Sequence, residues 1–291
     1  MPVTLTSRAR AKINLDLKVL GRRADGYHEL ESLVAFAGVG DLVSLTEGGD
    51  LSLTISGPRA QGLEVDERNL ILRAARILAE EAGPLRWGHF HLVKRLPVAS
   101  GIGGGSADAA AALRLLARLN GIAAGAPQLM RAAGRVGADV PVCIESRARV
   151  MAGIGERLGP ALRLPQLHAL LVNPAIPVET AAVFRELGLR AGERLEGATK
   201  PVEPGLLERD PLITNLAASR NDLEPPAQRV APLLADLVVT LRELPGCRLA
   251  RMSGSGATCF AIFDDCRQSA AAAKALARAH PGWWVKPTVL S

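Results

Sequence analysis

A run of closely spaced glycines between Pro97 and Ala107 is the segment of this sequence whose composition most directly suggests chemistry. It reads Pro97-Val98-Ala99-Ser100-Gly101-Ile102-Gly103-Gly104-Gly105-Ser106-Ala107. Glycine has no Cβ, so the backbone amides of such a loop can approach a phosphate closely. We predict that Ser106 is the N-cap of the helix that follows, which would direct the positive end of that helix at the same anion. The loop is therefore suited to a triphosphate.

Three other interpretations of the glycine run can be tested on the letters. A flexible linker would be rich in serine and glycine on both sides, whereas this run joins an apolar strand pattern to a helical one. A Walker A loop needs a Gly-Lys pair followed by Ser or Thr, and the chain contains no Gly-Lys pair. A dinucleotide fingerprint needs a third glycine where Ser106 stands. The linker is disfavoured, the Walker A loop is excluded, and dinucleotide binding is weakly supported.

Lys12 and Asp139 are charged residues outside the loop whose position in the pattern is notable. Residues 11–20 alternate apolar and polar side chains, which predicts a half-buried strand with Lys12 and Asn14 on its polar face. From the residues alone we favour a solvated lysine. Asp139 stands two positions before Pro141, and here a capping or turn carboxylate and a catalytic carboxylate are equally supported.

The elements that would position these residues alternate between strands and helices, and 291 residues can bury two separate cores. We expect strands at 11–20, 41–46, 51–56 and 88–96, helices at 69–82, 107–119 and 230–244, and a long surface loop at 191–211. Glycines and prolines at 153–165 interrupt the pattern before an apolar run at 168–172. The sequence predicts an α+β fold with two domains, residues 1–158 and 159–291.

Composition and charge narrow the classes of partner. A net charge of +6 favours anionic partners, but the basic residues are scattered and aromatic residues make up only 3% of the chain, so we expect no nucleic-acid partner. Four cysteines without CxxC spacing suit a reducing compartment. His89 and His91 alternate on a strand without a nearby third ligand, so zinc is not expected. With no apolar run of membrane-spanning length and no signal-peptide pattern, we expect a soluble, cytoplasmic protein without a membrane partner.

Further motifs, taken with the glycine loop, resemble those of the GHMP kinase superfamily and stand in the same order. The segment Asp25-Gly26-Tyr27-His28-Glu29 is similar to one branch of that superfamily, whose members act on 4-diphosphocytidyl-2-C-methyl-D-erythritol. Ala99, Ser100 and Ala107 depart from the residues common in the loop. The other matching segments are Ala11-Lys12-Ile13-Asn14-Leu15, Gly21-Arg22-Arg23-Ala24, Gly137-Ala138-Asp139-Val140-Pro141 and Ser253-Gly254-Ser255-Gly256-Ala257, with weaker similarity at Asn69-Leu70 and Asn221-Asp222-Leu223-Glu224.

The resemblance implies a ribosomal S5 domain 2-like N-terminal domain and a ferredoxin-like C-terminal domain. It also implies a reaction in the non-mevalonate route to isoprenoids, in which the γ-phosphoryl group of ATP is transferred with Mg²⁺ to the 2-hydroxyl of the cytidyl substrate. A tertiary alcohol barely ionises near neutral pH, so a carboxylate must accept its proton, and Asp139 is the expected base. Lys12 would stabilise the carboxylate and the developing phosphoryl charge.

The resemblance assigns further residues to ATP and to the substrate, each with a structural alternative. Asn69 and Lys94 would border the adenine, although an Asn before a helix is first an N-cap. Ser106 would bind Mg²⁺, and Asp108 could join it or simply complement the helix dipole. The expected substrate residues are Asn14, Tyr27, His28, Ile154, Thr180 and Phe184, although apolar residues at such positions more often belong to a core. Two alternatives remain open: another small-molecule kinase of the superfamily, and a non-catalytic regulator. A basic RNA-binding protein with a related α+β fold is a further hypothesis, disfavoured by the scarcity of aromatic residues. We expect a monomer or a weak homodimer.

Overall fold

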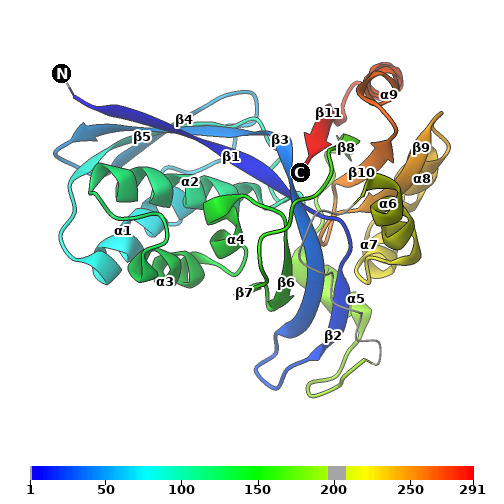
Figure 1. Cartoon of the computed structure of the whole chain (residues 1–291), viewed down its shortest axis with the longest axis horizontal. Helices are drawn as coiled ribbons and strands as arrows, with labels where there is room; N and C mark the ends of the chain where they lie inside the picture. The colour runs from blue at the N-terminus through cyan, green and yellow to red at the C-terminus, as the bar shows by residue number, and fades with distance from the viewer. Residues whose placement is uncertain (1, 196–207) are drawn as a thin grey trace. The chain divides into compact units, whose positions relative to one another are not determined.

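A computed structural model describes residues 2–195 and 208–291 of the chain (Figure 1). The chain forms two compact units, each assembled from several segments. The first unit contains Met1–Ala11, Val39–Val98 and Gly103–Ser146, and the second contains Lys12–Gly38, Ala99–Ile102 and Arg147–Ser291. Each unit mixes strands and helices, so the predicted α+β fold is confirmed. The proposed domain boundary after residue 158 stays a prediction.

The first unit is a sheet with helices on one face. Its strands are the beginning of β1 (Thr4–Asn14), the end of β3 (His28–Gly48), β4 (Ser52–Ser56) and β5 (Trp87–Val93). β5 pairs antiparallel with β3 and parallel with β4. The helices α1 (Leu70–Ala82), α2 (Gly104–Leu119), α3 (Pro127–Val136) and α4 (Val140–Glu145) all lie against the same face of this sheet in Figure 1.

Period-two alternation along β5 explains why only one face of that sheet is covered. Phe90 and Leu92 are buried beneath the helices, whereas His89 and His91 lie on the opposite face. The His89 ring contacts the hydroxyls of Ser52 and Thr54, at 2.9 and 2.8 Å. Both histidines therefore belong to a ladder of side chains across β4 and β5. Within the described part of the chain, no cluster of three or more His, Cys, Asp or Glu residues could hold a metal ion.

The second unit contains an antiparallel sheet in the order β11 (Trp284–Leu290), β8 (Leu167–Asn173), β10 (Cys259–Phe263) and β9 (Cys247–Met252). The first part of β3 pairs with β2 (Lys18–Arg22), with β6 (Arg149–Gly153) and with β11. β6 also pairs with β7 (Arg157–Leu158). The helices are α5 (Thr180–Leu187), α6 (Arg209–Ala218), α7 (Glu224–Val230), α8 (Leu233–Arg242) and α9 (Cys266–Ala279). α8 packs on β9 and β10, and α9 packs on β8 and β11.

Some sequence predictions change at this level. The strand expected at 11–20 is interrupted between β1 and β2, where the Asp16 carboxylate accepts a hydrogen bond of 2.6 Å from the Leu33 amide. Lys12 and Asn14, expected on a half-buried strand, are each only 4% exposed. The loop predicted at 191–211 lies mostly outside the described residues, and α6 begins within it. None of the described helices has the length and apolar character needed to cross a membrane.

Candidate active site

The glycine-rich loop leads into α2, and the helix begins earlier than predicted. Its N-cap is Gly103, whose φ of 64° is a left-handed conformation that glycine adopts without steric cost. Gly104, Gly105 and Ser106 therefore form the first turn, and the prediction that Ser106 is the N-cap is wrong. The first amides of a helix have no intrahelical acceptor, so this turn presents donors to an anion. The conformational freedom of Gly103 moves the start of the helix toward the loop.

The tip of the loop, Ala99–Ile102, belongs to the second unit and is held there by neutral hydrogen bonds. Ser253 Oγ donates to the Gly101 carbonyl at 3.1 Å, and the Thr258 amide donates to the Ser100 carbonyl at 3.1 Å. The Lys12 amide donates to the Ile102 carbonyl at 2.9 Å. At Gly101, φ is +72° and an added Cβ would lie 2.5 Å from the Ser253 carbonyl oxygen. This position therefore requires glycine.

The segment Ser253–Ala257 is the partner of the loop tip. The fully buried Ser253 Oγ accepts a hydrogen bond of 3.0 Å from the Asn14 amide while it donates to Gly101. Gly254 has φ +57°, and a Cβ there would lie 2.8 Å from the Gly101 carbonyl oxygen. One hydroxyl thus joins the strand of a predicted substrate residue to the predicted phosphate loop.

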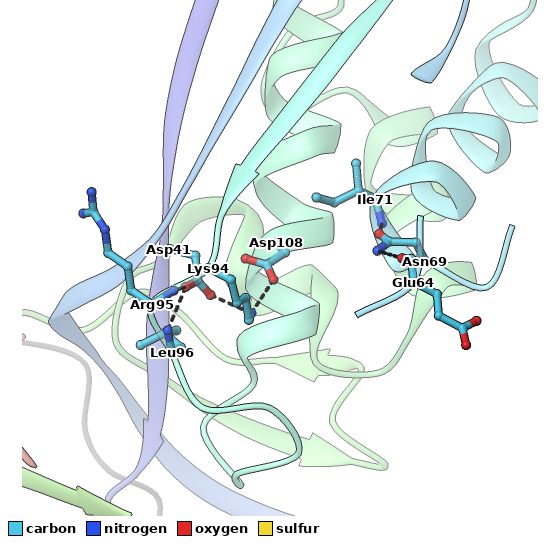
Figure 2. Close-up of polar contacts among 8 residues, drawn as sticks. All are labelled: Asp41, Glu64, Asn69, Ile71, Lys94, Arg95, Leu96 and Asp108. Carbon is cyan, nitrogen blue, oxygen red and sulfur yellow. Dashed lines mark hydrogen bonds and ion pairs between the residues drawn. The ribbon is translucent and has the colours of Figure 1, made fainter. Parts of the chain in front are cut away.

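In the first unit, the start of α2 lies beside a buried cluster of one lysine and two aspartates (Figure 2). Lys94 Nζ lies 2.6 Å from Asp41 Oδ2 and 2.5 Å from Asp108 Oδ2. Asp41 Oδ1 also accepts the amides of Arg95 and Leu96, at 2.5 and 2.8 Å. The Asp108 Oδ1 atom is buried and has no hydrogen-bond partner among the described residues. The ammonium is therefore shared by two carboxylates that have different numbers of partners.

The chemistry of this cluster shifts its proton affinities. Burial, helped by repulsion from Asp41 and opposed by attraction to Lys94, raises the pKa of Asp108 to about 8. The pKa of Lys94 is raised by the two carboxylates, although burial opposes the shift. A Cβ on Gly104 would lie 3.4 Å from Lys94 Nζ, which places the cluster directly against the first turn of α2. The predicted contact of Lys94 with adenine stays a prediction, and its ammonium is engaged by carboxylates.

Asn69 caps α1, which confirms the structural alternative weighed for it. Its Oδ1 accepts the Ile71 amide at 3.0 Å, and its Nδ2 donates to the Glu64 carbonyl at 2.9 Å (Figure 2). Both polar groups of the side chain are thus used within the first unit. A contact of Asn69 with a nucleotide stays a prediction.

Several predicted substrate residues come together in the second unit. The rings of His28 and Phe184 are stacked, with centroids 4.4 Å apart and an angle of 24° between the planes. Burial, together with the nearby Arg22 charge, lowers the pKa of His28, which favours a neutral imidazole. Tyr27, next to His28, is 61% exposed. An exposed phenol beside a stacked imidazole offers planar surfaces of the kind that a base can stack on.

The remaining predicted substrate residues are anchored by hydrogen bonds. Asn14 Nδ2 donates to Ser32 Oγ at 2.7 Å, and Thr180 Oγ1 lies 2.8 Å from Ser255 Oγ. The Ile154 amide donates to Glu156 Oε2 at 2.6 Å. The contact of Thr180 ties α5 to the Ser253–Ala257 segment, so this helix and the loop tip share one support.

Lys12 and Asp139, the predicted catalytic pair, belong to different units. Lys12 lies at the end of β1 and is buried. Asp139 stands immediately before α4, and its side chain makes no capping hydrogen bond to that helix. The simple N-cap role for Asp139 is therefore not used, and its pairing with Lys12 stays a prediction.

Sequence reasoning missed the residue that supports the strand of Asn14. Arg251 is 6% exposed and donates to the carbonyls of Leu15, Leu216 and Ser219, at 2.8, 2.7 and 2.7 Å. An arginine flanked by Ala250 and Met252, directly before the Ser253–Ala257 segment, was the available signal. Asn221, noted only as a weak similarity, donates to the carbonyls of Met252 and Gly254, both at 2.8 Å.

Both halves of the chain match the sequence profiles of one enzyme family. Residues 69–147 match the N-terminal domain of GHMP kinases, and residues 205–282 match their C-terminal domain. The first match contains the glycine loop and Asp139, and the second contains the Ser253–Ala257 segment. The class defined by these matches is that of the GHMP kinases.

Relatives of this chain match it over nearly its whole length. A 4-diphosphocytidyl-2-C-methyl-D-erythritol kinase of Methylorubrum extorquens is 57% identical over 288 residues, 99% of each chain. The kinase of the same name from Methylobacterium radiotolerans is 58% identical over 287 residues, covering 98% of this chain and 99% of the relative. A crystal structure of 4-(cytidine 5'-diphospho)-2C-methyl-D-erythritol kinase is 34% identical, with a TM-score of 0.78 and 99% of both chains covered.

A more distant match shows how widely the fold is shared. The L. major mevalonate kinase, crystallised with R-mevalonate, has a TM-score of 0.68 at 16% identity, which shows the fold alone. The chain is a kinase and belongs to the GHMP kinase family, within it to the 4-diphosphocytidyl-2-C-methyl-D-erythritol kinases.

Proposed function

We propose that this kinase transfers the γ-phosphoryl group of ATP to the 2-hydroxyl of 4-diphosphocytidyl-2-C-methyl-D-erythritol. The observation that carries the proposal is the first turn of α2, where Gly103 opens the helix and the turn presents backbone donors to the phosphates. The names of the full-length relatives support the choice of substrate. The exposed Tyr27 and the His28–Phe184 stack are the surfaces that we assign to the cytosine.

We assign the chemical step to Asp139 and Lys12. Asp139 accepts the proton of the 2-hydroxyl as this oxygen bonds to the γ-phosphorus, and the bond from that phosphorus to ADP breaks. Lys12 stabilises the negative charge that develops on the attacking oxygen and the phosphoryl group. Phosphoryl transfer depends mainly on positioning and electrostatics, so a positively charged side chain suits this role better than a neutral one. Asn14 positions the substrate hydroxyls.

The residues at the start of α2 also fit a magnesium ion. The Ser106 hydroxyl is an oxygen ligand of the type that Mg²⁺ prefers, and the carboxyl group of Asp108 has one oxygen without a hydrogen-bond partner among the described residues. We assign Ser106 as the protein ligand. When bound, the ion neutralises charge on the β- and γ-phosphates. In the same proposal, Asn69 and Lys94 border the adenine.

We also infer a cytoplasmic enzyme that is a monomer or a weak homodimer. All four cysteines lie in the described part of the chain and are free thiols, which suits a reducing compartment. Light scattering at several protein concentrations tests the oligomeric state. A mass equal to that of a dimer at all concentrations would contradict the inference.

The test of function is ADP release from ATP and Mg²⁺ with the cytidyl substrate, beside mevalonate and homoserine. We expect turnover with the cytidyl substrate alone, and a loss of about 10²-fold or more in kcat for Asp139→Asn, because a general base contributes about that much. Asp50→Asn, at an exposed turn of the same unit, is the matched control. Turnover with another alcohol would contradict the substrate, and full activity of Asp139→Asn would contradict the base. Binding without turnover would favour a regulator.

A further inference from the structure

A cavity of about 790 Å³ opens on the second unit beside β9, the strand at the edge of its described sheet. Its walls come from the end of α6 and the segment after it, the start of α7, the end of α8 and β9, which lie close together in Figure 1. This volume is within the usual range for small-molecule sites. The described residues around it include none of those assigned to ATP or to the substrate.

The charges around the cavity favour an anion. Four arginines and two acids line it, an excess of two positive charges in the lining, and Arg248 also pairs with Asp264 at 2.5 Å and with Asp210 at 3.4 Å, which are outside the lining. Both acids are already engaged by backbone amides: Asp222 Oδ2 accepts the Val19 amide, and Glu224 Oε2 accepts the Met252 amide, each at 2.8 Å. Each acid therefore has one oxygen committed to the fold. The four arginines are Arg220, Arg242, Arg248 and Arg251.

Two of these arginines have guanidinium groups that can turn toward a ligand. The side chain of Arg242 is 58% exposed, and its ion pair with Glu224 is long, at 3.6 Å. The side chain of Arg220 is 68% exposed and is paired with Asp222 through Nε. The acids of both pairs are mostly buried, at 12% exposed for Asp222 and 14% for Glu224, and each keeps its backbone amide donor if the arginine turns to a ligand.

The edge of β9 shows why the occupant is a small molecule and not an added strand. At Met252 the outward amide is bound by Glu224, and the outward carbonyl is bound by Asn221. Ala250, two residues earlier, faces the same edge because antiparallel pairing alternates, and it lines the cavity. An added peptide strand needs several edge residues in succession with free backbone groups. Ala250 can offer one such residue, but the outward backbone groups of Met252 are already bound by side chains. The edge can therefore offer a local backbone contact but cannot template a strand.

We propose that this cavity binds a small ligand that carries a diphosphate group, at a site separate from those of ATP and the substrate. Arginine matches phosphate oxygens with two parallel hydrogen bonds, and two neighbouring phosphates can engage arginines from different walls. The location of the cavity extends the proposal to regulation. Asn221 lines the cavity and binds the Gly254 carbonyl, and Arg251 lines it and binds the Leu15 carbonyl. A bound ligand thus acts on the segments next to Asn14 and Ser253.

The test is calorimetric titration of inorganic pyrophosphate into the full-length protein in magnesium-free buffer. The titration is made both without and with a saturating non-hydrolysable ATP analogue. We expect one site in the wild type. Arg220→Gln and Arg242→Gln should each weaken the Kd by about tenfold, the effect of losing one charge-assisted hydrogen bond. Ala217→Trp should abolish binding by filling the cavity without changing a charge, because Ala217 is an exposed lining residue.

Arg229→Gln is the matched control, since Arg229 is a half-exposed arginine of α7 that pairs with Glu186 and does not line the cavity. It should bind pyrophosphate like the wild type. Absence of binding to the wild type, displacement by the ATP analogue, or equal affinity in Ala217→Trp would overturn the site. For regulation, pyrophosphate should change the KM for the cytidyl substrate in the wild type but not in Ala217→Trp. If pyrophosphate changes the KM equally in the wild type and in Ala217→Trp, or changes it in neither, the proposed regulation is overturned.

Discussion

The two ends of the glycine-rich loop are held by different chemistry. Where the loop becomes α2, the support is the buried ionic cluster of Lys94, Asp41 and Asp108. At the tip, the support is neutral: the Ser253 hydroxyl, backbone amides, and glycines that allow backbones to approach closely. Ionic support depends on the protonation of buried groups, whereas neutral support depends on shape. The two ends should therefore respond to different perturbations.

This difference also bears on how the loop could work. The ionic end lies against the first turn of the helix, and under the proposed function the amides of this turn would be aligned for the phosphates before ATP binds. The neutral end connects to Asn14 through Ser253, so the order of the tip is linked to the substrate strand. In the proposed function, the cluster would preorganise the first turn for the nucleotide, and the tip would connect the loop to the acceptor side.

The largest effect is expected at the ionic end, from Lys94→Met. Removal of the ammonium leaves the buried side chains of Asp41 and Asp108 without their cation, and removing one partner of a buried ion pair costs about 3–5 kcal/mol. Urea unfolding should show this loss in the free energy of unfolding. Lys274→Met, at an exposed position on α9, should change it by less than about 0.5 kcal/mol. Equal losses in the two variants would contradict a structural role for the cluster.

A smaller effect, which depends on pH, is expected from Asp108→Asn. The folded protein keeps the Asp108 proton up to about pH 8, whereas the ordinary pKa is 3.8. Stability from this group is therefore full below about pH 3.8 and is lost as the pH rises to about 8. Asparagine cannot titrate, so the variant should gain about 1.4 kcal/mol per pH unit relative to the wild type from pH 5 to about pH 8.

Unfolding in urea at a series of pH values measures this gain. Asp50→Asn, at an exposed turn, provides the reference for an aspartate outside the cluster. A difference between wild type and Asp108→Asn that stays constant from pH 5 to pH 9 would show that Asp108 does not keep its proton in the folded state. The ionic end would then lose the property that separates it from the neutral end.

The sequence was sufficient for features that depend on local pattern. Period-two alternation located β5, helical periodicity located α1 and most of α2, and the motifs in order indicated the family. The start of α2 was placed too late, because the left-handed conformation of Gly103 cannot be read from the letters. Asn69 was correctly weighed as a cap, because capping depends on neighbouring residues.

Features that depend on distant contacts could not be predicted. Asp41 and Lys94 are 53 positions apart, so their pairing through β3 and β5 has no local signature. The same holds for Arg251, whose partner Leu15 is 236 positions away. Lys12 was expected on a half-buried strand for the same reason, since the elements that bury it come from later parts of the chain. Burial of polar groups is decided by tertiary packing.

The smallest effect is expected at the neutral end, from Ala99→Gly. Ala99 has φ 48°, a left-handed conformation that costs an alanine about 1–2 kcal/mol and a glycine almost nothing. Glycine also gives the unfolded chain about 0.5–1 kcal/mol of additional entropy, so the net gain in the free energy of unfolding should be about 0.5 kcal/mol. Ala124→Gly, at an exposed turn without positive φ, should instead lose about 0.5–1 kcal/mol. Because no charge is involved, the gain at Ala99 should be equal at pH 5 and pH 9. A gain that follows pH as it does for Asp108→Asn would mean that the tip and the cluster are coupled, and the two ends of the loop would form a single support.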